Sequence, residues 1–313
     1  SRDGPGFGSR GLGRWRTGFC SDRKTVAVKR DLSLLRMLHP MIVEALYTMG
    51  ESVKDARVTT DSVLVAHQKG VARFDLDQAQ NEPAFEYRIA EDGPSEITTV
   101  HQFIDRNYFL IGFRYDDDEV TSESKTRPAM EIRQYGKSEA KTFTKTFTGI
   151  SHGKSVVASM DDRYIVSGME DVKKVYLWNN LGHLKHIMDV PSPLTCVTLI
   201  NKIKDWEIVA GCLDGTVLKI CHLFKSWRKS ILLEGNGQPI ECMHSCRGSS
   251  QVAVASSNGI RIFDGKHGKE TFRCERHKNA RRICLNPVTT SLVAIADVHG
   301  SVFVVDYQKD VSL

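Results

Sequence analysis

Five hairpin patterns recur along the chain, each with two apolar, strand-length runs joined by a short turn. They lie at residues 63–76, 165–178, 208–220, 252–264 and 293–306. The predicted turns are Lys69-Gly70, Asp171-Val172, Asp214-Gly215, Asn258-Gly259 and His299-Gly300. The last four turns follow one another at intervals of about 41 to 44 residues. The pattern therefore predicts an all-β chain made of one repeated unit.

Between the hairpins lie further strand-length runs, so that each repeat reads as four consecutive strands. Six such units are visible, at about residues 53–89, 96–147, 155–190, 194–234, 240–274 and 281–307. A period of this length with four strands is typical of a β-propeller blade. We predict one closed β-propeller domain over residues 24–313, preceded by a basic Gly/Arg-rich tail or linker at residues 1–23. Six blades fit the count, and seven stay open because Leu32–Gly50 is apolar and unassigned.

Two units depart from the regular pattern. The sixth lacks a fourth strand, and an unpaired edge would remain there unless another segment filled it. Thr25–Lys29 has the composition of a strand, and we predict that it completes the last blade and closes the ring. In the second unit, residues 116–129 are acidic and rich in Ser and Thr, which predicts a solvated insertion between the second and third strands.

The hairpins resemble those of WD-repeat (WD40-like) β-propeller proteins. The similarity lies in Val166–Asp171 followed by Val175–Asn179, and in the aromatic or apolar residue before Asp75, Asp264 and Asp306 where that family has Trp-Asp. It is degenerate, because Trp-Asp itself never occurs. The resemblance implies that the turn aspartates and the third-strand aromatic stabilise each blade from within. The residues concerned are Asp171, Trp178, Asp214 and Asp297.

A shorter match lies upstream of the predicted closing strand. The segment Arg14–Gly18 resembles the stretch that joins the F-box to the propeller in F-box/WD-repeat proteins. No F-box helices precede it in this sequence. The resemblance implies attachment to a ubiquitin-ligase adaptor only if an F-box lies further upstream.

Charge is distributed unevenly along the chain. Residues 1–30 hold eight Arg or Lys against two Asp, a net of +6, so that the rest of the chain contributes −1 to the total of +5. The first segment, with Trp15 among its arginines, is a candidate for RNA contact through phosphates and stacking. The remainder has no cationic bias of the kind that nucleic-acid binders show. No run is long and apolar enough to span a membrane, and we expect no membrane association.

The eight cysteines fall mostly within apolar strand patterns, and the N-terminus has no signal-peptide pattern. We therefore expect reduced core thiols and a cytoplasmic or nuclear protein. Cys242, His244 and Cys246 share one face of a predicted strand, but no second pair has zinc-ligand spacing. We expect neither a metal nor another cofactor.

Enzyme motifs are incomplete. Residues 6–11 match G-x-G-x-x-G, and Lys29 follows at about the distance of a kinase lysine. The ten or so residues between Lys29 and His39 are too few for the kinase helix that carries the ion-pairing Glu, and no catalytic-loop or metal-binding motif follows. No HExxH or G-x-S-x-G pattern occurs either. The sequence favours a protein that is not an enzyme.

Candidate binding residues lie in the predicted rim loops, where a propeller tolerates variation. One rim, formed by the second-to-third turns and the connections between blades, carries a cationic group suited to carboxylate or phosphate. Its members are His67, Lys69, Lys173, Lys174, Arg276, His277, Lys278, Arg281 and Arg282. The opposite rim has an aromatic and cationic group suited to a protein interface. Its members are Phe224, Trp227 and Arg228.

Taken with the resemblances, these residues favour a non-enzymatic protein-interaction propeller. The most specific expectation is the substrate-recognition module of an F-box/WD-type ubiquitin ligase that binds an acidic or phosphorylated segment. A general scaffold subunit of a multiprotein complex and an RNA-associated propeller are the alternatives.

Overall fold

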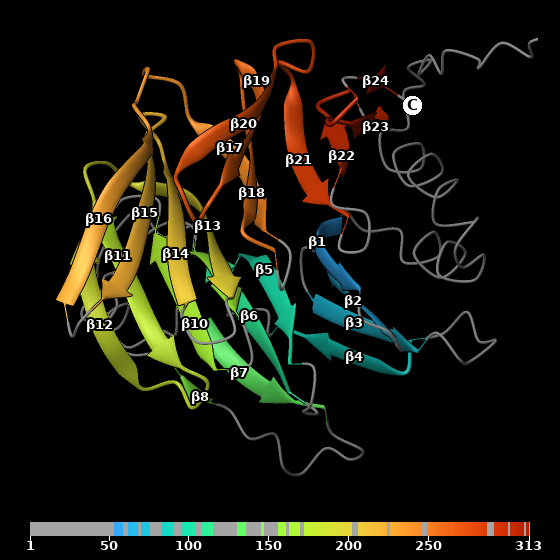
Figure 1. Ribbon diagram of the computed structural model, residues 1–313. Coiled ribbons are helices and arrows are strands. Elements are labelled where there is room, and N and C mark those ends of the chain that lie inside the picture. The colour runs from blue at the N-terminus through green and yellow to red at the C-terminus, as the bar shows by residue number, and fades with distance from the viewer. Residues whose placement is uncertain are drawn as a thin grey trace, which may run out of the picture.

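The structure is a computed structural model that describes most of the chain from residue 53 onward (Figure 1). The described residues are 53–58, 62–67, 70–75, 83–89, 95–103, 108–114, 130–135, 145–146, 156–160, 163–169, 172–201, 206–223, 226–245, 249–286, 291–299, 301–309 and 311–312. None of them lies in a helix, and they form six small antiparallel sheets. The chain is therefore all-β over its described part.

The first three sheets are named A, B and C in chain order, and each is a meander in which neighbouring strands pair. Sheet A contains β1 (Val53–Val58), β2 (Ser62–His67), β3 (Gly70–Asp75) and β4 (Phe85–Arg88). Sheet B contains β5 (Glu96–Gln102), β6 (Tyr108–Arg114), β7 (Met130–Gln134) and β8 (Lys145–Thr146). Sheet C contains β9 (Val156–Met160), β10 (Tyr164–Met169), β11 (Val172–Asn179) and β12 (Leu184–Asp189).

Sheets D, E and F repeat the same meander. Sheet D contains β13 (Leu194–Asn201), β14 (Trp206–Cys212), β15 (Val217–Leu223) and β16 (Ser226–Leu233). Sheet E contains β17 (Ile240–Ser245), β18 (Gln251–Ser256), β19 (Gly259–Asp264) and β20 (Lys269–Cys274). Sheet F contains β21 (Ala280–Leu285), β22 (Leu292–Asp297), β23 (Val302–Asp306) and β24 (Val311–Ser312). The six four-stranded repeats predicted from the sequence are confirmed, and their arrangement is consistent with propeller blades.

The last sheet differs from the sequence prediction. Its fourth strand is β24, which comes from the C-terminal end of the chain and pairs with Val305 and Asp306 of β23. The predicted closing strand, Thr25–Lys29, lies outside the described residues, as do residues 1–23, Leu32–Gly50 and the insertion at 116–129. The N-terminal closure thus stays a prediction. A smaller difference concerns the turn predicted at Asp171-Val172, since Val172 already belongs to β11.

The turns between the second and third strands of a sheet explain why the sequence has Gly and Asp at these positions. Gly215 and Gly259 have φ values of 88° and 107°, in the region that side chains other than glycine rarely adopt. Asp214 accepts a hydrogen bond from the Thr216 amide at 2.9 Å, and Asp297 accepts bonds from the amides of His299 and Ser301. These aspartates fix the turns through Asx-type bonds.

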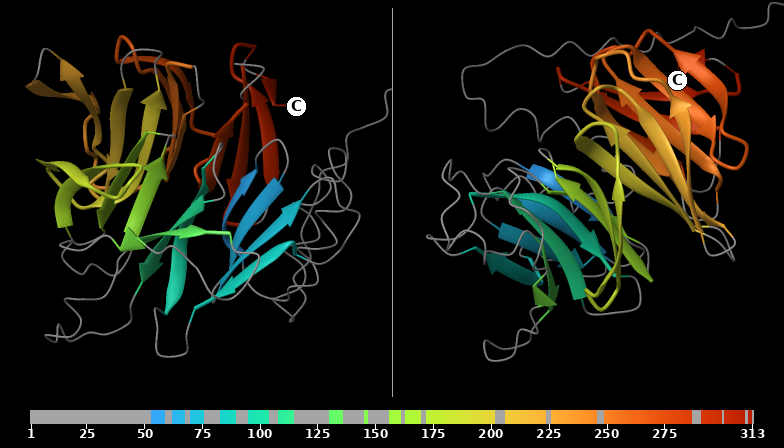
Figure 2. Two further views of the ribbon diagram at one scale, coloured as in Figure 1. Left: turned by 90° about the horizontal axis from the view of Figure 1, so that it is seen from below. Right: turned by 90° about the vertical axis from the view of Figure 1, so that its left-hand side faces the viewer.

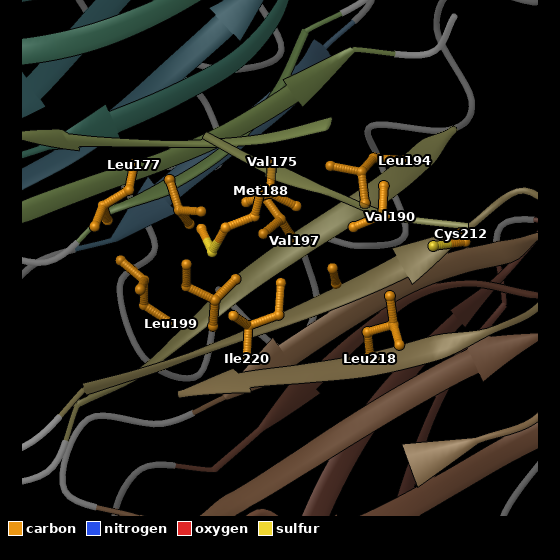
Figure 3. Close-up of a cluster of buried hydrophobic side chains, with 13 residues drawn as sticks. Val175, Leu177, Met188, Val190, Leu194, Val197, Leu199, Cys212, Leu218 and Ile220 are labelled. Carbon is orange, nitrogen blue, oxygen red and sulfur yellow. The ribbon is translucent and has the colours of Figure 1, made fainter. Parts of the chain in front are cut away.

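Consecutive sheets pack face to face through apolar layers, one between each neighbouring pair from A–B to E–F. Figure 3 shows the layer between sheets C and D, where Val175, Leu177 and Met188 of sheet C meet Leu199 and Ile220 of sheet D. Because both faces of a sheet are covered in this way, its strands read as continuous apolar runs. The first strand of each sheet contacts the first strand of the next sheet. We call these first strands the inner strands, and the sheets follow one another in chain order beside them (Figure 2).

Two buried polar contacts hold sheets together from within. The indole Nε1 of Trp178 donates to the hydroxyl of Ser167 at 3.0 Å, which supports the structural role expected for this tryptophan. In sheet D, Lys219 and Glu207 are each 8% exposed and form an ion pair of 3.1 Å. Lys219 Nζ also donates to the main-chain oxygens of Gly265 and Lys266, in the turn that joins β19 to β20 of sheet E. The ammonium thus ties two sheets together.

Candidate functional site

The first strands of sheets A, B, D, E and F carry polar residues at two positions each that share one face of the strand. β1, β5, β13, β17 and β21 each have an irregularity of register just after their start. Such a bulge re-aims the following side chains. In each of these strands, the residue directly after the bulge and the residue two positions later lie on the same face. We call these ten residues the inner polar residues. They are Asp55, Arg57, Thr99, His101, Cys196, Thr198, Cys242, His244, Arg282 and Cys284.

Hydrogen bonds from the inner polar residues join one sheet to the next. Asp55 accepts from the Val100 amide at 3.1 Å, and Arg57 Nε donates to the Val100 carbonyl at 3.2 Å. Thr198 and Ser245 join sheets D and E through their hydroxyls, 2.7 Å apart. His244 Nδ1 accepts from the Leu285 amide at 3.1 Å and so joins sheets E and F. These contacts are a polar seam along the inner strands.

The electrostatics of this seam disfavour charge on its thiols and on the half-buried His244. Burial raises the pKa of Cys196, Cys242 and Cys284 above the ordinary thiol value, so these cysteines are protonated at neutral pH. Burial, followed by the charge of Arg57, lowers the pKa of His244 to about 4. A thiolate nucleophile needs the opposite shift. We therefore assign a structural role to the seam residues that bond to a neighbouring sheet. Arg282 is exposed, and its guanidinium donates to the Arg281 carbonyl of its own strand, so it remains available to a partner.

The inner polar residues also carry information on how the sheets are arranged. Arg57 belongs to sheet A, yet its charge acts on Cys242 and His244 of sheet E and on Cys284 of sheet F. The charge of Arg282 in sheet F acts on Cys196 of sheet D. The first sheet therefore approaches the last two, although no ladder joins sheets A and F within the described residues.

The cationic loop between β20 and β21 is the strongest candidate for binding a partner. Arg276, Lys278, Arg281 and Arg282 are all exposed, as the sequence predicts. Arg281 forms an ion pair with Glu241 of β17, which partly neutralises it. Arg276, Lys278 and Arg282 have no carboxylate within ion-pair distance in the described part of the chain. We call these three the rim cations.

His277 and His67 do not belong with the rim cations. The ring of His277 lies 4.8 Å from that of Phe303, and burial, followed by the charge of Arg276, lowers its pKa. His67 is only 1% exposed at the end of β2, which removes it from the surface predicted at this rim. The β-hairpin turn brings its ring against Gly70, which the apolar pattern alone did not reveal.

The other predicted rim residues are dispersed. Lys173 and Lys174 are exposed at the start of β11 in sheet C, and the structure gives no contact between them and the rim cations. Lys69 and Phe224 lie outside the described residues. On the opposite rim, Trp227 is half-buried, stacked on His186 with ring centroids 4.8 Å apart, while Arg228 is exposed.

No protein-family model matches the sequence, and a search of curated proteins found no similar one. Within the residues that the structure describes, no three His, Cys, Asp or Glu side chains are grouped as a metal ion would require. In that same part of the chain, there is no helix of the length and apolar character needed to cross a membrane.

Proposed function

We propose that this protein is a WD-repeat-like β-propeller that serves as a protein-interaction platform, and that its rim cations bind an acidic or phosphorylated segment of a partner. The observation that carries this function is the cluster of exposed Arg276, Lys278 and Arg282 without carboxylate partners among the described residues. Guanidinium groups suit phosphate and carboxylate because each can donate two parallel hydrogen bonds.

Closure of the six sheets into a ring is part of the same proposal. It is supported by the reach of Arg57 toward sheets E and F. It is also supported by sheet A, whose face away from sheet B is buried as well. The side chains on that face are at most 4% exposed: Val63, Val65, Ala72 and Phe74. A ring would bring the connections between sheets to one end, where a partner can contact several at once.

The most specific form of the function is substrate recognition in an F-box/WD-type ubiquitin ligase. It rests on the sequence resemblance at Arg14–Gly18, which lies outside the described residues. A general scaffold subunit is the alternative. RNA association through the basic segment at residues 1–30 is the candidate from a different class.

Binding of a fluorescent phosphoserine- and glutamate-rich peptide to the full chain tests the rim. We expect Arg276→Ala/Arg282→Ala to weaken binding about 100-fold, because each charge-assisted hydrogen bond to a guanidinium contributes about 1.5 kcal/mol or more. Melting should not change, since both side chains are exposed.

The matched control is Lys266→Ala/Lys269→Ala, which removes two exposed cations at the opposite end of sheet E. This variant should bind the peptide as the native chain does. Equal weakening by both variants would show that only net charge matters and would contradict recognition by the rim cations. So would binding that survives Arg276→Ala/Arg282→Ala unchanged.

A further inference from the structure

β16 (Ser226–Leu233) is the outer strand of sheet D, in the order β13-β14-β15-β16, and pairs with β15 along one edge only. At eight residues it is the longest of the outer strands that the structure describes, and it contains no proline. Among described strands, none pairs with its second edge. A long, regular edge of this kind presents backbone donors and acceptors to an incoming strand.

β16 differs from the comparable outer strands β4, β12 and β20 because it has cations but no acidic residue of its own. In β4, Arg88 is paired with Glu86 at 2.8 Å. In β20, Arg273 is paired with Glu275 at 2.6 Å. By contrast, Arg228 and Lys229 of β16 have no carboxylate within ion-pair distance among the described residues, and the strand has no acidic residue of its own. Lys229 Nζ donates to the main-chain oxygen of Asp189 at 2.5 Å.

The alternation along β16 places different chemistry on its two faces. Trp227, Lys229 and Ile231 share the face that looks toward sheet C, where Trp227 stacks on His186. Ile231 is 52% exposed, the most exposed large apolar side chain of the described residues. Arg228 and Ser230 occupy the other face. On one face, the strand thus offers the apolar side chains of Trp227 and Ile231 with the ammonium of Lys229 between them. The guanidinium of Arg228 lies on the opposite face.

We propose that β16 is a docking edge on which an extended, acidic segment of a partner protein adds as a fifth strand of sheet D. Paired antiparallel, its residues opposite Ile231 and Trp227 are apolar, and those opposite Lys229 and Arg228 are acidic. The recognised pattern is therefore apolar, any residue, acidic, acidic, apolar. Cross-strand pairs of opposite charge and of apolar residues are the ones that stabilise an antiparallel ladder.

A second copy of this chain is a poor occupant of the same edge. Pairing of β16 with β16 would bring Arg228 and Lys229 of both strands onto one short ladder with no carboxylate between them. Like charges at this spacing destabilise a ladder. The charges of the strand therefore favour a foreign, acidic segment. The site is also independent of the rim cations, which lie in the loop between β20 and β21 and near the start of β21.

A fluorescein-labelled ten-residue peptide with a Val-Ser-Glu-Glu-Val core, titrated onto the full chain, tests this edge. A peptide with Val-Ser-Lys-Lys-Val in its place is the negative probe. We expect the acidic peptide to bind and the basic one not to bind. In Arg228→Glu/Lys229→Glu, affinity for the acidic peptide should fall at least about tenfold, while the basic peptide should now bind. Amide hydrogens of β16 should exchange more slowly with peptide bound.

The matched control is Lys269→Glu/Arg273→Glu, which changes the charge equally on the outer strand of the next sheet. It should leave acidic-peptide binding within about twofold, as should Arg276→Ala/Arg282→Ala at the rim. Three results would overturn the proposal: no binding of the acidic peptide, loss of binding in the rim variant instead of the β16 variant, or binding without slower exchange in β16. We expect each variant to be folded, because all the substituted side chains are exposed, and circular dichroism checks this.

Discussion

Replacing Lys219 by Met is expected to lower the free energy of unfolding by about 3–5 kcal/mol. The ammonium is buried between sheets D and E, where it neutralises Glu207 and donates to the carbonyls of Gly265 and Lys266. Methionine fills a similar volume, so packing is largely kept. The loss comes from the buried Glu207 carboxylate, which loses the ammonium 3.1 Å away, and from the two carbonyls, which lose this donor. Urea unfolding followed by tryptophan fluorescence measures the change.

Two further variants show whether the loss comes from the ion pair. Lys219→Met/Glu207→Leu should recover a good part of the stability, because both members of the buried ion pair are then replaced together by apolar side chains. Lys269→Met, at an exposed lysine, should change stability by less than about 0.5 kcal/mol. A cost for Lys219→Met no larger than that of Lys269→Met would contradict the buried tie between the two sheets.

Acidification from pH 6.5 to 4 is expected to destabilise the protein through His244 by up to about 3 kcal/mol. The pKa of this histidine is lowered to about 4 by burial and by the charge of Arg57. In this window the unfolded chain binds the proton and the folded chain does not, so the free energy of unfolding falls as the pH falls. Below pH 4 both states are protonated at this site, and its contribution is constant. Protonation also opposes the bond that Nδ1 accepts from the Leu285 amide.

The difference between the native chain and His244→Gln isolates this effect from other titrating groups. The native chain should lose its stability advantage over the variant between pH 6.5 and 4. His183→Gln, at an exposed histidine, should run parallel to the native chain. Parallel curves for all three proteins, measured by denaturant unfolding at each pH, would show that His244 is not held neutral by the fold.

Much of the fold could be predicted because its signals are local. Strand alternation, short turns and glycines such as Gly259 with positive φ each leave a mark within about fifteen residues, and the repeat multiplies that mark. The role of β24 was missed because two residues carry no periodicity. Which segment pairs with an edge depends on distant parts of the chain, which local composition does not specify.

The candidate site was less predictable for the same reason. A cluster of cations is visible in sequence, but the pairing of Arg281 with Glu241 joins residues 40 positions apart. The inner polar residues depend on bulges, which have no reliable signal in a single sequence. In the sequence, Lys219 is a single charged residue in an apolar strand. Its partners, Glu207 and the carbonyls of Gly265 and Lys266, become apparent only from the pairing and packing of sheets D and E. The alternation did place Cys242 and His244 on one face, and the structure shows that this face is the seam.

The measurement that tests the ring most directly is the pKa of His244 in Arg57→Gln, read by NMR titration of the imidazole. Arg57 lies in the first sheet and His244 in the fifth, so they can influence each other only if the sheets curve back on themselves. We predict that removal of this charge raises the pKa of His244 above its native value of about 4. Arg88→Gln, which removes a charge from the outer strand of the same first sheet, should leave it unchanged. An identical pKa of His244 in the native chain and in Arg57→Gln would contradict a closed propeller.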